Sequence, residues 1–264
     1  MIKWVLQSNL MKDHNIGKLV DFLEVQGVPW EGIEVIPFDT SNIKGVDTSG
    51  ITVFYGSVGL VRRVSQNNQW KPGVFFNPPS FAFQALLEGY GDELLNADSE
   101  VLTMREIMVQ ERPGDRHFFC RPVEDDKAFT GKVFSWKELQ EQAIQLKEAD
   151  SSNRLQLDTK VQVASTKEIL HEVRNFVIDG KVSTSSFYGR GMMNQEVPQE
   201  EIEYAERMTQ RYQPSEVFVL DTCLLADGSR RVVETNCMNS SGFYWVDIYK
   251  LVKDLNSYLL HKHG

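Results

Sequence analysis

The first ninety residues alternate short apolar runs with stretches of helical periodicity. Apolar side chains at 16, 19, 20 and 23 recur at helical spacing and Gly27 follows them, so a helix is expected over 16–25. A second helix is expected over 58–64. Apolar runs of strand length stand at 3–6, 33–37 and 51–55. Strands that alternate with helices favour βαβ units and a small parallel sheet.

Beyond residue 90 the pattern becomes one of hairpins and covering helices. Ala97 to Glu100 has the composition of a helix start, with Val101, Met104 and Ile107 on one stripe. Ser135 and Glu138 form a capping box for a second helix. Further helices are expected at 200–211 and 245–259, and strands at 116–120, 133–134, 160–164, 169–178, 181–186, 217–221 and 231–236. We therefore predict an α/β lobe over 1–95 and an α+β region over 96–264.

Composition narrows the class of protein only slightly. The 264 residues are 41% hydrophobic and carry a net charge of −9, so nucleic acid is an unlikely main partner, because phosphate contacts need a basic surface. The chain has no apolar stretch of membrane-spanning length. The cysteines are scattered and form no C-x-x-C pair, which is typical of reduced residues, and we expect a cytoplasmic protein.

A hairpin near the C-terminus carries the clearest chemistry. If Asp227 and Gly228 are a two-residue turn, strict counting places Glu234 opposite Asp221, and Asn236 joins them on the same face. Like charges so placed destabilise a sheet unless a cation lies between them. Hard oxygen ligands suit Mg²⁺, which in turn suggests a phosphate-bearing substrate. The alternative is two exposed acids on an edge hairpin.

Three other segments have candidate roles. The loop 121–132 can wrap phosphate oxygens with Gly131, Lys127 and Lys132, or it is a solvated loop whose lysines offset neighbouring acids. In the hairpin about Asp179-Gly180, Glu172 and Arg174 share a face with Phe176. Arg174 then forms a solvent-facing ion pair, or it neutralises a phosphate or holds a carboxylate through two hydrogen bonds. Backbone groups that leave the strand near 160–164 can meet an adenine edge, at Gln162, Val163, Ala164 and Ser165.

These motifs, in this order, resemble the ATP-grasp superfamily, and within it the R-two-K clade of small bacterial and phage proteins. The resemblance covers roughly residues 95 to 260, and the upstream segments 54–57 and 70–73 also look like that clade. It rests on the segments Phe118-Phe119-Cys120-Arg121-Pro122, Lys127-Ala128-Phe129-Thr130-Gly131, Glu172-Val173-Arg174, Asp179-Gly180-Lys181-Val182, Asp221 and Glu234-Thr235-Asn236. The sequence departs from the superfamily at Arg121, where lysine is usual before the proline.

The resemblance implies a fold and a set of roles. The fold is two α+β lobes that grip ATP, with a hinge near 162–166, after a small α/β lobe. Asp221, Glu234 and Asn236 would bind Mg²⁺, and Arg121 and Arg174 would serve the phosphoryl site as catalytic residues. Nucleotide contacts would come from Arg121, Lys127, Gly131, Lys132, Gln162, Val163, Ala164, Ser165, Glu172 and Arg174.

The activity implied is that of an ATP- and Mg²⁺-dependent carboxylate–amine ligase with an acyl-phosphate intermediate. Its partners would be small-molecule or peptide carboxylates and amines. A non-catalytic nucleotide-binding module, regulatory or scaffolding, is the alternative, and Arg121 is the reason for keeping it. The sequence names neither substrate and does not fix the oligomeric state.

Overall fold

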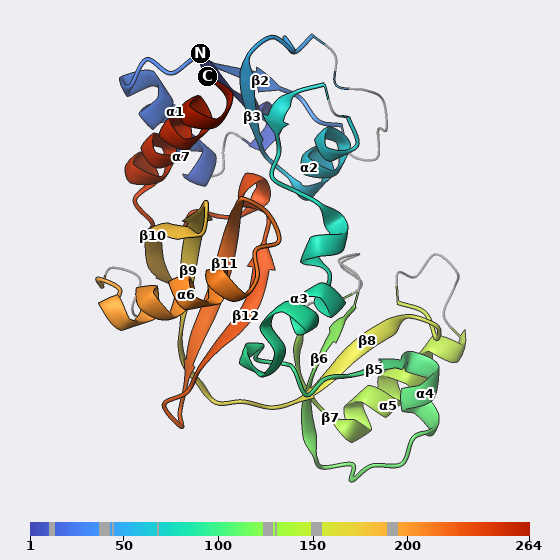
Figure 1. Ribbon diagram of the computed structural model, residues 1–264. Helices are drawn as coiled ribbons and strands as arrows, with labels where there is room; N and C mark the ends of the chain where they lie inside the picture. Colours follow the sequence, from blue (N-terminus) through green and yellow to red (C-terminus); the bar gives the residue numbers. More distant parts are fainter. Residues whose placement is uncertain are drawn as a thin grey trace.

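The computed structural model describes the whole chain except residues 11–13, 37–42, 44, 68, 124–128, 130, 149–154 and 189–194. Within the described part, the strands form three four-stranded sheets, one at the top of Figure 1 and two below it, at the left and at the lower right. No helix in this part of the chain is long and apolar enough to cross a membrane. Short 3-10 turns connect the elements at Ser8–Leu10, Pro78–Phe81, Gly91–Glu93, Leu146–Glu148 and Met238–Ser240.

The first sheet is parallel throughout, as the alternation of strands and helices predicts. Its order is β2 (Trp30–Ile33), β1 (Ile2–Gln7), β3 (Ile51–Tyr55) and β4 (Lys71–Gly73). Helices α1 (His14–Val25) and α2 (Val58–Ser65) accompany it. The strand expected at 33–37 instead ends at Ile33. The backbone of Val35 bonds to the side chain of Asn9, at 3.0 and 3.4 Å, rather than to a strand.

The second sheet is antiparallel and lies in the lower right of Figure 1. Its order is β5 (Glu100–Thr103), β8 (Lys160–Ser165), β6 (His117–Pro122) and β7 (Lys132–Ser135). Helices α4 (Met104–Val109) and α5 (Trp136–Gln145) pack on it, and the Ser135/Glu138 capping box is confirmed.

The helix expected from Ala97 is wrong. Residues 100–103 pair with β8 as a strand, and the helix begins only after Thr103. A second capping box, between Thr103 and Glu106, fixes that start. Helix α3 (Phe83–Tyr90) begins after the 3-10 turn at Pro78–Phe81.

The third sheet is antiparallel in the order β10 (Lys181–Tyr188), β9 (Ile169–Ile178), β11 (Val217–Leu225) and β12 (Arg230–Asn236). Helix α6 (Gln199–Arg211) covers one face. Helix α7 (Ile248–His263) covers the other and lies beside α1 of the first sheet, so both chain ends meet at the top of Figure 1. It begins at Ile248, not Trp245, because Asp247 caps it.

The buried cores group the three sheets into two bodies. One core joins the first and third sheets through side chains such as Trp4, Leu19, Phe176, Val219 and Leu255. The second sheet has a core of its own around Phe118 and Trp136. A polar site at the seam between the second and third sheets therefore lies between two separately packed bodies.

Candidate active site

The hairpin of β11 and β12 aligns Asp221 with Glu234, as predicted, but by a different route. The turn has three residues, because Leu225 N bonds to Ser229 O and Leu224 pairs with Arg230. A bulge at Val233 then adds one residue to β12 and restores the alignment. The two departures from strict counting cancel.

Asp221 lies at the centre of a row that crosses three strands. Arg174 of β9 is directly opposite it on one side and Glu234 of β12 on the other. Toward the interior, this face of the sheet carries Phe176 and Val219 in the shared core. The face is thus apolar at one end and polar at the other, where it meets the seam.

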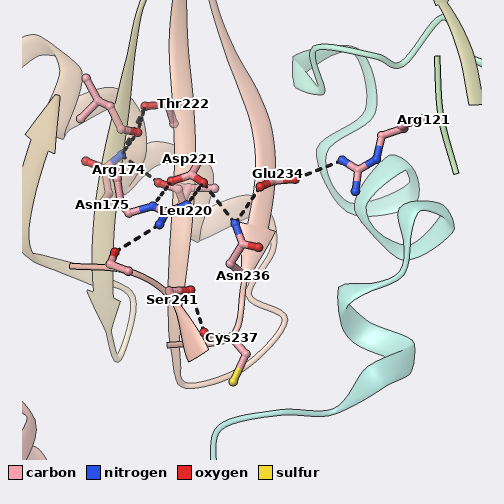
Figure 2. A network of polar contacts seen from close by, with 12 residues as sticks. Arg121, Arg174, Asn175, Leu220, Asp221, Thr222, Glu234, Asn236, Cys237 and Ser241 are labelled. Carbon is pink, nitrogen blue, oxygen red and sulfur yellow. Dashed lines mark hydrogen bonds and ion pairs between the residues drawn. The ribbon is translucent and has the colours of Figure 1, made fainter. Parts of the chain in front are cut away.

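Asn236 connects the two acids. Its Nδ2 donates to Asp221 Oδ2 at 3.1 Å and to Glu234 Oε1 at 3.0 Å (Figure 2). A single polar atom thus bridges both carboxylates, and the other end of the amide is an oxygen acceptor. Two carboxylates and an amide oxygen are the donor types that Mg²⁺ prefers, although it is the amide nitrogen that faces the acids here. No group of three or more His, Cys, Asp or Glu suited to a metal ion occurs among the described residues.

Arg174 is buried and holds Asp221 through two parallel hydrogen bonds, at 2.9 and 2.7 Å. Its third nitrogen donates to Gly242 O at 3.2 Å. The guanidinium lies 5.2 and 4.8 Å from the ring centres of Tyr188 and Tyr244. The two-bond carboxylate contact considered from sequence is therefore made, and the carboxylate belongs to the protein itself.

Arg121 reaches across the seam from β6 of the second sheet. Its Nη1 lies 3.0 Å from Glu234 Oε2 (Figure 2). Both side chains are about one-third exposed, at 38% and 33%, so the pair is solvent-screened. Arg121, the candidate phosphate-neutralising residue, thus forms an ion pair with Glu234, one of the candidate metal ligands.

Glu172 lies two residues before Arg174 and lines the same cavity as Asp221 and Glu234. Burial, reinforced by the charges of Asp221 and Glu234, raises the pKa of Glu172 to about 6. Three acids therefore share one region, with Arg174 opposing the accumulation of negative charge.

The first cavity has a volume of about 790 Å³ and lies between the second and third sheets. Arg121, Glu172, Asp221 and Glu234 line it together with Gly131. A Cβ on Gly131 would lie 2.9 Å from the Phe119 ring, so this position excludes larger residues. Arg174 and Asn236 do not line this cavity, although both touch Asp221.

Only some residues of the loop 121–132 and of the predicted adenine segment 162–165 lie at this site. Lys127 lies outside the described residues, and Lys132 lies over the ring of Phe134 in its own strand, 4.5 Å from the ring centre. Gln162 to Ser165 belong to β8 rather than to a loop. Val163 and Ala164 are buried, Gln162 faces a different cavity, and Ser165 alone of the four lines the first one.

Some residues at the site carry no local sequence signal. Asp98 accepts hydrogen bonds from the backbone and hydroxyl of Ser165, at 3.0 and 2.6 Å, and forms an ion pair with Lys167. Lys167 lines the first cavity. Tyr188 lies two residues after Ser186 in β10, so both side chains are on the same face of the sheet. Since Ser186 pairs with Arg174, only this period of two could have placed Tyr188 near Arg174.

The family model of the ATP-grasp domain, R-two-K clade family 3, matches residues 60–255. The comparison with curated protein sequences gives no significant match.

Solved structures that resemble the chain include ATP-grasp ligase PsnB complexed with a phosphomimetic variant of a minimal precursor, Mg and ADP. It matches 97% of this chain and 97% of its own at 15% identity, with a TM-score of 0.59. D-cycloserine synthetase DcsG matches 98% and 100% at 15% identity, with a TM-score of 0.61. D-alanyl-alanine synthetase A from Vibrio cholerae matches 99% and 98% at 12% identity, with a TM-score of 0.63.

The three solved structures share the fold over nearly the whole chain, so the fold class expected from sequence is confirmed. The family model spans more than half of the chain. The chain therefore belongs to family 3 of the R-two-K clade of ATP-grasp domains.

Proposed function

We propose that the protein is an ATP- and Mg²⁺-dependent ligase that joins a carboxylate to an amine through an acyl phosphate. An oxygen of the substrate carboxylate attacks the γ-phosphorus of ATP and ADP leaves. The amine then attacks the acyl carbon, and inorganic phosphate leaves with the acyl–oxygen electron pair. The observation that carries the proposal is the convergence of Asp221, Glu234 and Asn236 at a cavity edge, with two arginines beside them.

The residue roles follow from donors, charge and burial. Asp221, Glu234 and Asn236 would hold Mg²⁺, which when bound supplies charge neutralisation to the phosphate oxygens. Burial raises the pKa of Asp221, and Arg174 opposes this shift and orients the carboxylate through two hydrogen bonds. Arg121, which now pairs with Glu234, is a mobile cation for the phosphates. Gly131, which lines the first cavity, would offer its backbone N–H to the polyphosphate, and Lys127 and Lys132 would add positive charge.

The remaining nucleotide contacts would come from the cavity wall beyond the acids. Ser165 reaches the cavity from the end of β8, where Asp98 holds it, and Gln162, Val163 and Ala164 precede it in the strand. Glu172 lines the wall between this segment and Arg174.

A covalent enzyme intermediate is not part of this proposal. Burial raises the pKa of each cysteine thiol, Cys120, Cys223 and Cys237, to about 12, which disfavours a thiolate nucleophile. Catalysis would come from positioning and charge neutralisation, as is usual for phosphoryl transfer.

Glu234→Gln tests the metal assignment. The substitution removes a charged ligand but keeps the shape, so we expect Mg²⁺-dependent ADP release to fall at least about 100-fold, the usual effect of losing one charge-stabilising group. ADP release would be measured with pooled amino acids and peptides, and with hydroxylamine to trap an acyl phosphate. Circular dichroism should remain unchanged.

Glu24→Gln, an exposed change on α1, is the matched control and should behave as wild type. Wild-type turnover in Glu234→Gln would contradict the metal assignment. Mg-AMPPNP binding without ADP release under every acceptor condition would favour the non-catalytic module instead.

A further inference from the structure

A second cavity, of about 750 Å³, lies on the other side of the Arg121–Glu234 pair. Asn96, Arg121, Val233 and Glu234 line both cavities, so the two spaces share the wall that carries the candidate metal site. Asn236 lines only the second one. A molecule in the second cavity would therefore present its reacting group to Glu234, which lines both cavities, whereas Asp221 lines only the first.

The walls of this cavity come from all three sheets' bodies. Helix α2 contributes from the first lobe, and α3 with the turn before it contributes from the connecting segment, which Figure 1 shows between the other parts. The floor is the end of β12 and the turn after it. The size suits a molecule between an amino acid and a short peptide.

The side chains that line the outer part are mainly apolar. Those from α2, α3 and the segment between them include Val58, Val61, Phe76, Phe81, Phe83 and Leu86. The three phenylalanines are only partly buried, and the rings of Phe76 and Phe81 lie 5.4 Å apart. Partly exposed aromatic rings that are grouped around a cavity form an apolar surface, and its burial by an apolar ligand group is favourable.

Polar groups line the cavity mainly from β6, β8 and β12, and Arg62 and Gln84 add two from α2 and α3. Arg121 and Glu234 are paired with each other, and Gln162, Thr235 and Asn236 are neutral. Arg62 is the other charged residue among the lining side chains and is exposed. A strongly charged substrate body would lose hydration against the apolar wall, whereas a terminal carboxylate would meet the guanidinium of Arg121.

We propose that the second cavity binds the carboxylate substrate, and that this substrate is an apolar, preferably aromatic, acid of amino-acid to dipeptide size. Its carboxylate lies toward Arg121, and its side chain lies against Phe76, Phe81 and Phe83. This inference rests on the proposed ligase activity, since that activity defines which carboxylate is activated. It goes beyond that activity by naming the chemical class of the acid.

Binding of two matched probes tests the inference. N-acetyl-L-phenylalanine and N-acetyl-L-aspartate would be titrated by saturation-transfer NMR into the full chain saturated with Mg-AMPPNP. We expect the phenylalanine derivative to bind at least about tenfold more tightly, because an apolar site discriminates at this level for each missing apolar group. Equal or tighter binding of the aspartate derivative would overturn the proposal, as would no saturable binding of either probe.

Two valine-to-tryptophan variants locate the binding. Val58 lines the cavity, so Val58→Trp should fill it and weaken N-acetyl-L-phenylalanine at least about tenfold. Val109, which is 71% exposed on α4 and lines neither cavity, gives the control, and Val109→Trp should bind as wild type. Should Val58→Trp not fold, Phe81→Ala replaces it with the same expectation. Unchanged affinity in the folded cavity variant would place the probe elsewhere and overturn the proposal.

Mg-AMPPNP affinity measured on the same samples separates this inference from the proposed function. Normal nucleotide affinity without selective binding of the aromatic acid overturns only the substrate class. Selective binding of the aromatic acid without any nucleotide affinity overturns the ligase and leaves an apolar-acid site.

Discussion

The two arginine–carboxylate pairs of the site differ in burial, and this difference sets their roles. Arg174 and Asp221 have side chains only 7% and 3% exposed, so removing either partner would leave a buried charge, at a cost of about 3–5 kcal/mol. Arg121 and Glu234 are about one-third exposed, and such pairs contribute roughly 0–1 kcal/mol. The first pair is a fixed part of the sheet, whereas the second costs little to separate, as the proposed role of Arg121 in phosphate binding requires.

Glu172 gives this site a dependence on pH. Its pKa is raised to about 6 in the folded protein, first by burial and then by Asp221 and Glu234. The folded state therefore holds this proton more tightly than the unfolded chain does, and stability falls as the pH rises from about 4.5 to about 6. Glu172→Gln removes this loss, so we expect its melting temperature to fall less than that of wild type over this range.

Thermal denaturation of both proteins in nucleotide-free buffer from about pH 4.5 to about pH 7.5 measures the effect, since this range spans the shift. The exposed change Glu24→Gln should reproduce the wild-type curve. Parallel curves for wild type and Glu172→Gln would show that this carboxyl titrates normally.

At the scale of the elements, the tip of the β11–β12 hairpin depends on one glycine. Gly228 has φ +83°, in the left-handed region, and a Cβ there would meet no atom within 4 Å. Gly228→Ala therefore carries backbone strain alone, and we expect a loss of roughly 1–2 kcal/mol in the free energy of unfolding. Urea denaturation would measure it.

Gly17 offers the matched substitution in a helix. It lies inside α1 and also has open space around its Cα, so Gly17→Ala should raise the free energy of unfolding by about 0.5–1 kcal/mol. We therefore expect the two glycine-to-alanine changes, neither of which causes a steric clash, to change the free energy of unfolding in opposite directions. A stabilising Gly228→Ala would contradict the left-handed turn.

The same hairpin shows how far sequence reasoning reaches. The Asp-Gly dipeptide identifies the hairpin, but local chemistry does not set its register, which depends on a three-residue turn and on the bulge at Val233. The strand at 100–103 escapes local patterns for a related reason, because its partner β8 lies far along the chain. The Thr103–Glu106 capping box is a local signal from which the correct start of helix α4 could have been predicted.

The candidate site was predictable to the extent that it lies within one sheet. Periodicity of two places Glu172 with Arg174, and hairpin pairing places Asp221 with Glu234. The contact between Arg121 and Glu234 joins residues 113 positions apart on separately packed bodies, and no local pattern encodes it. The same holds for the second cavity, whose walls come from distant parts of the chain.

At the scale of the whole molecule, Asn239 ties the third sheet to the first. It is fully buried, its Nδ2 donates to Phe54 O at 2.7 Å, and its Oδ1 accepts from Phe75 N at 2.8 Å. Its own backbone oxygen accepts from Gly56 N at 2.9 Å. These bonds, with the shared core, make the first and third sheets one body, whereas the second sheet packs around a core of its own.

Asn239→Ala tests this division. The change leaves a buried carbonyl and a buried N–H without partners, each worth about 1–3 kcal/mol, so global stability should fall by at least about 2 kcal/mol. Native-state hydrogen exchange should show protection falling together in β1, β3, β9 and β11, because these strands share one core. Amides of β6 and β8 should keep their wild-type local opening rates, since their core is separate.

A different pattern of exchange in Asn239→Ala would contradict the division. If β6 and β8 lost protection in step with β1 and β9 under conditions where local opening dominates exchange, the second sheet would belong to the same cooperative unit. The cleft between the second and third sheets would then lack the independent motion that gripping and releasing a nucleotide requires.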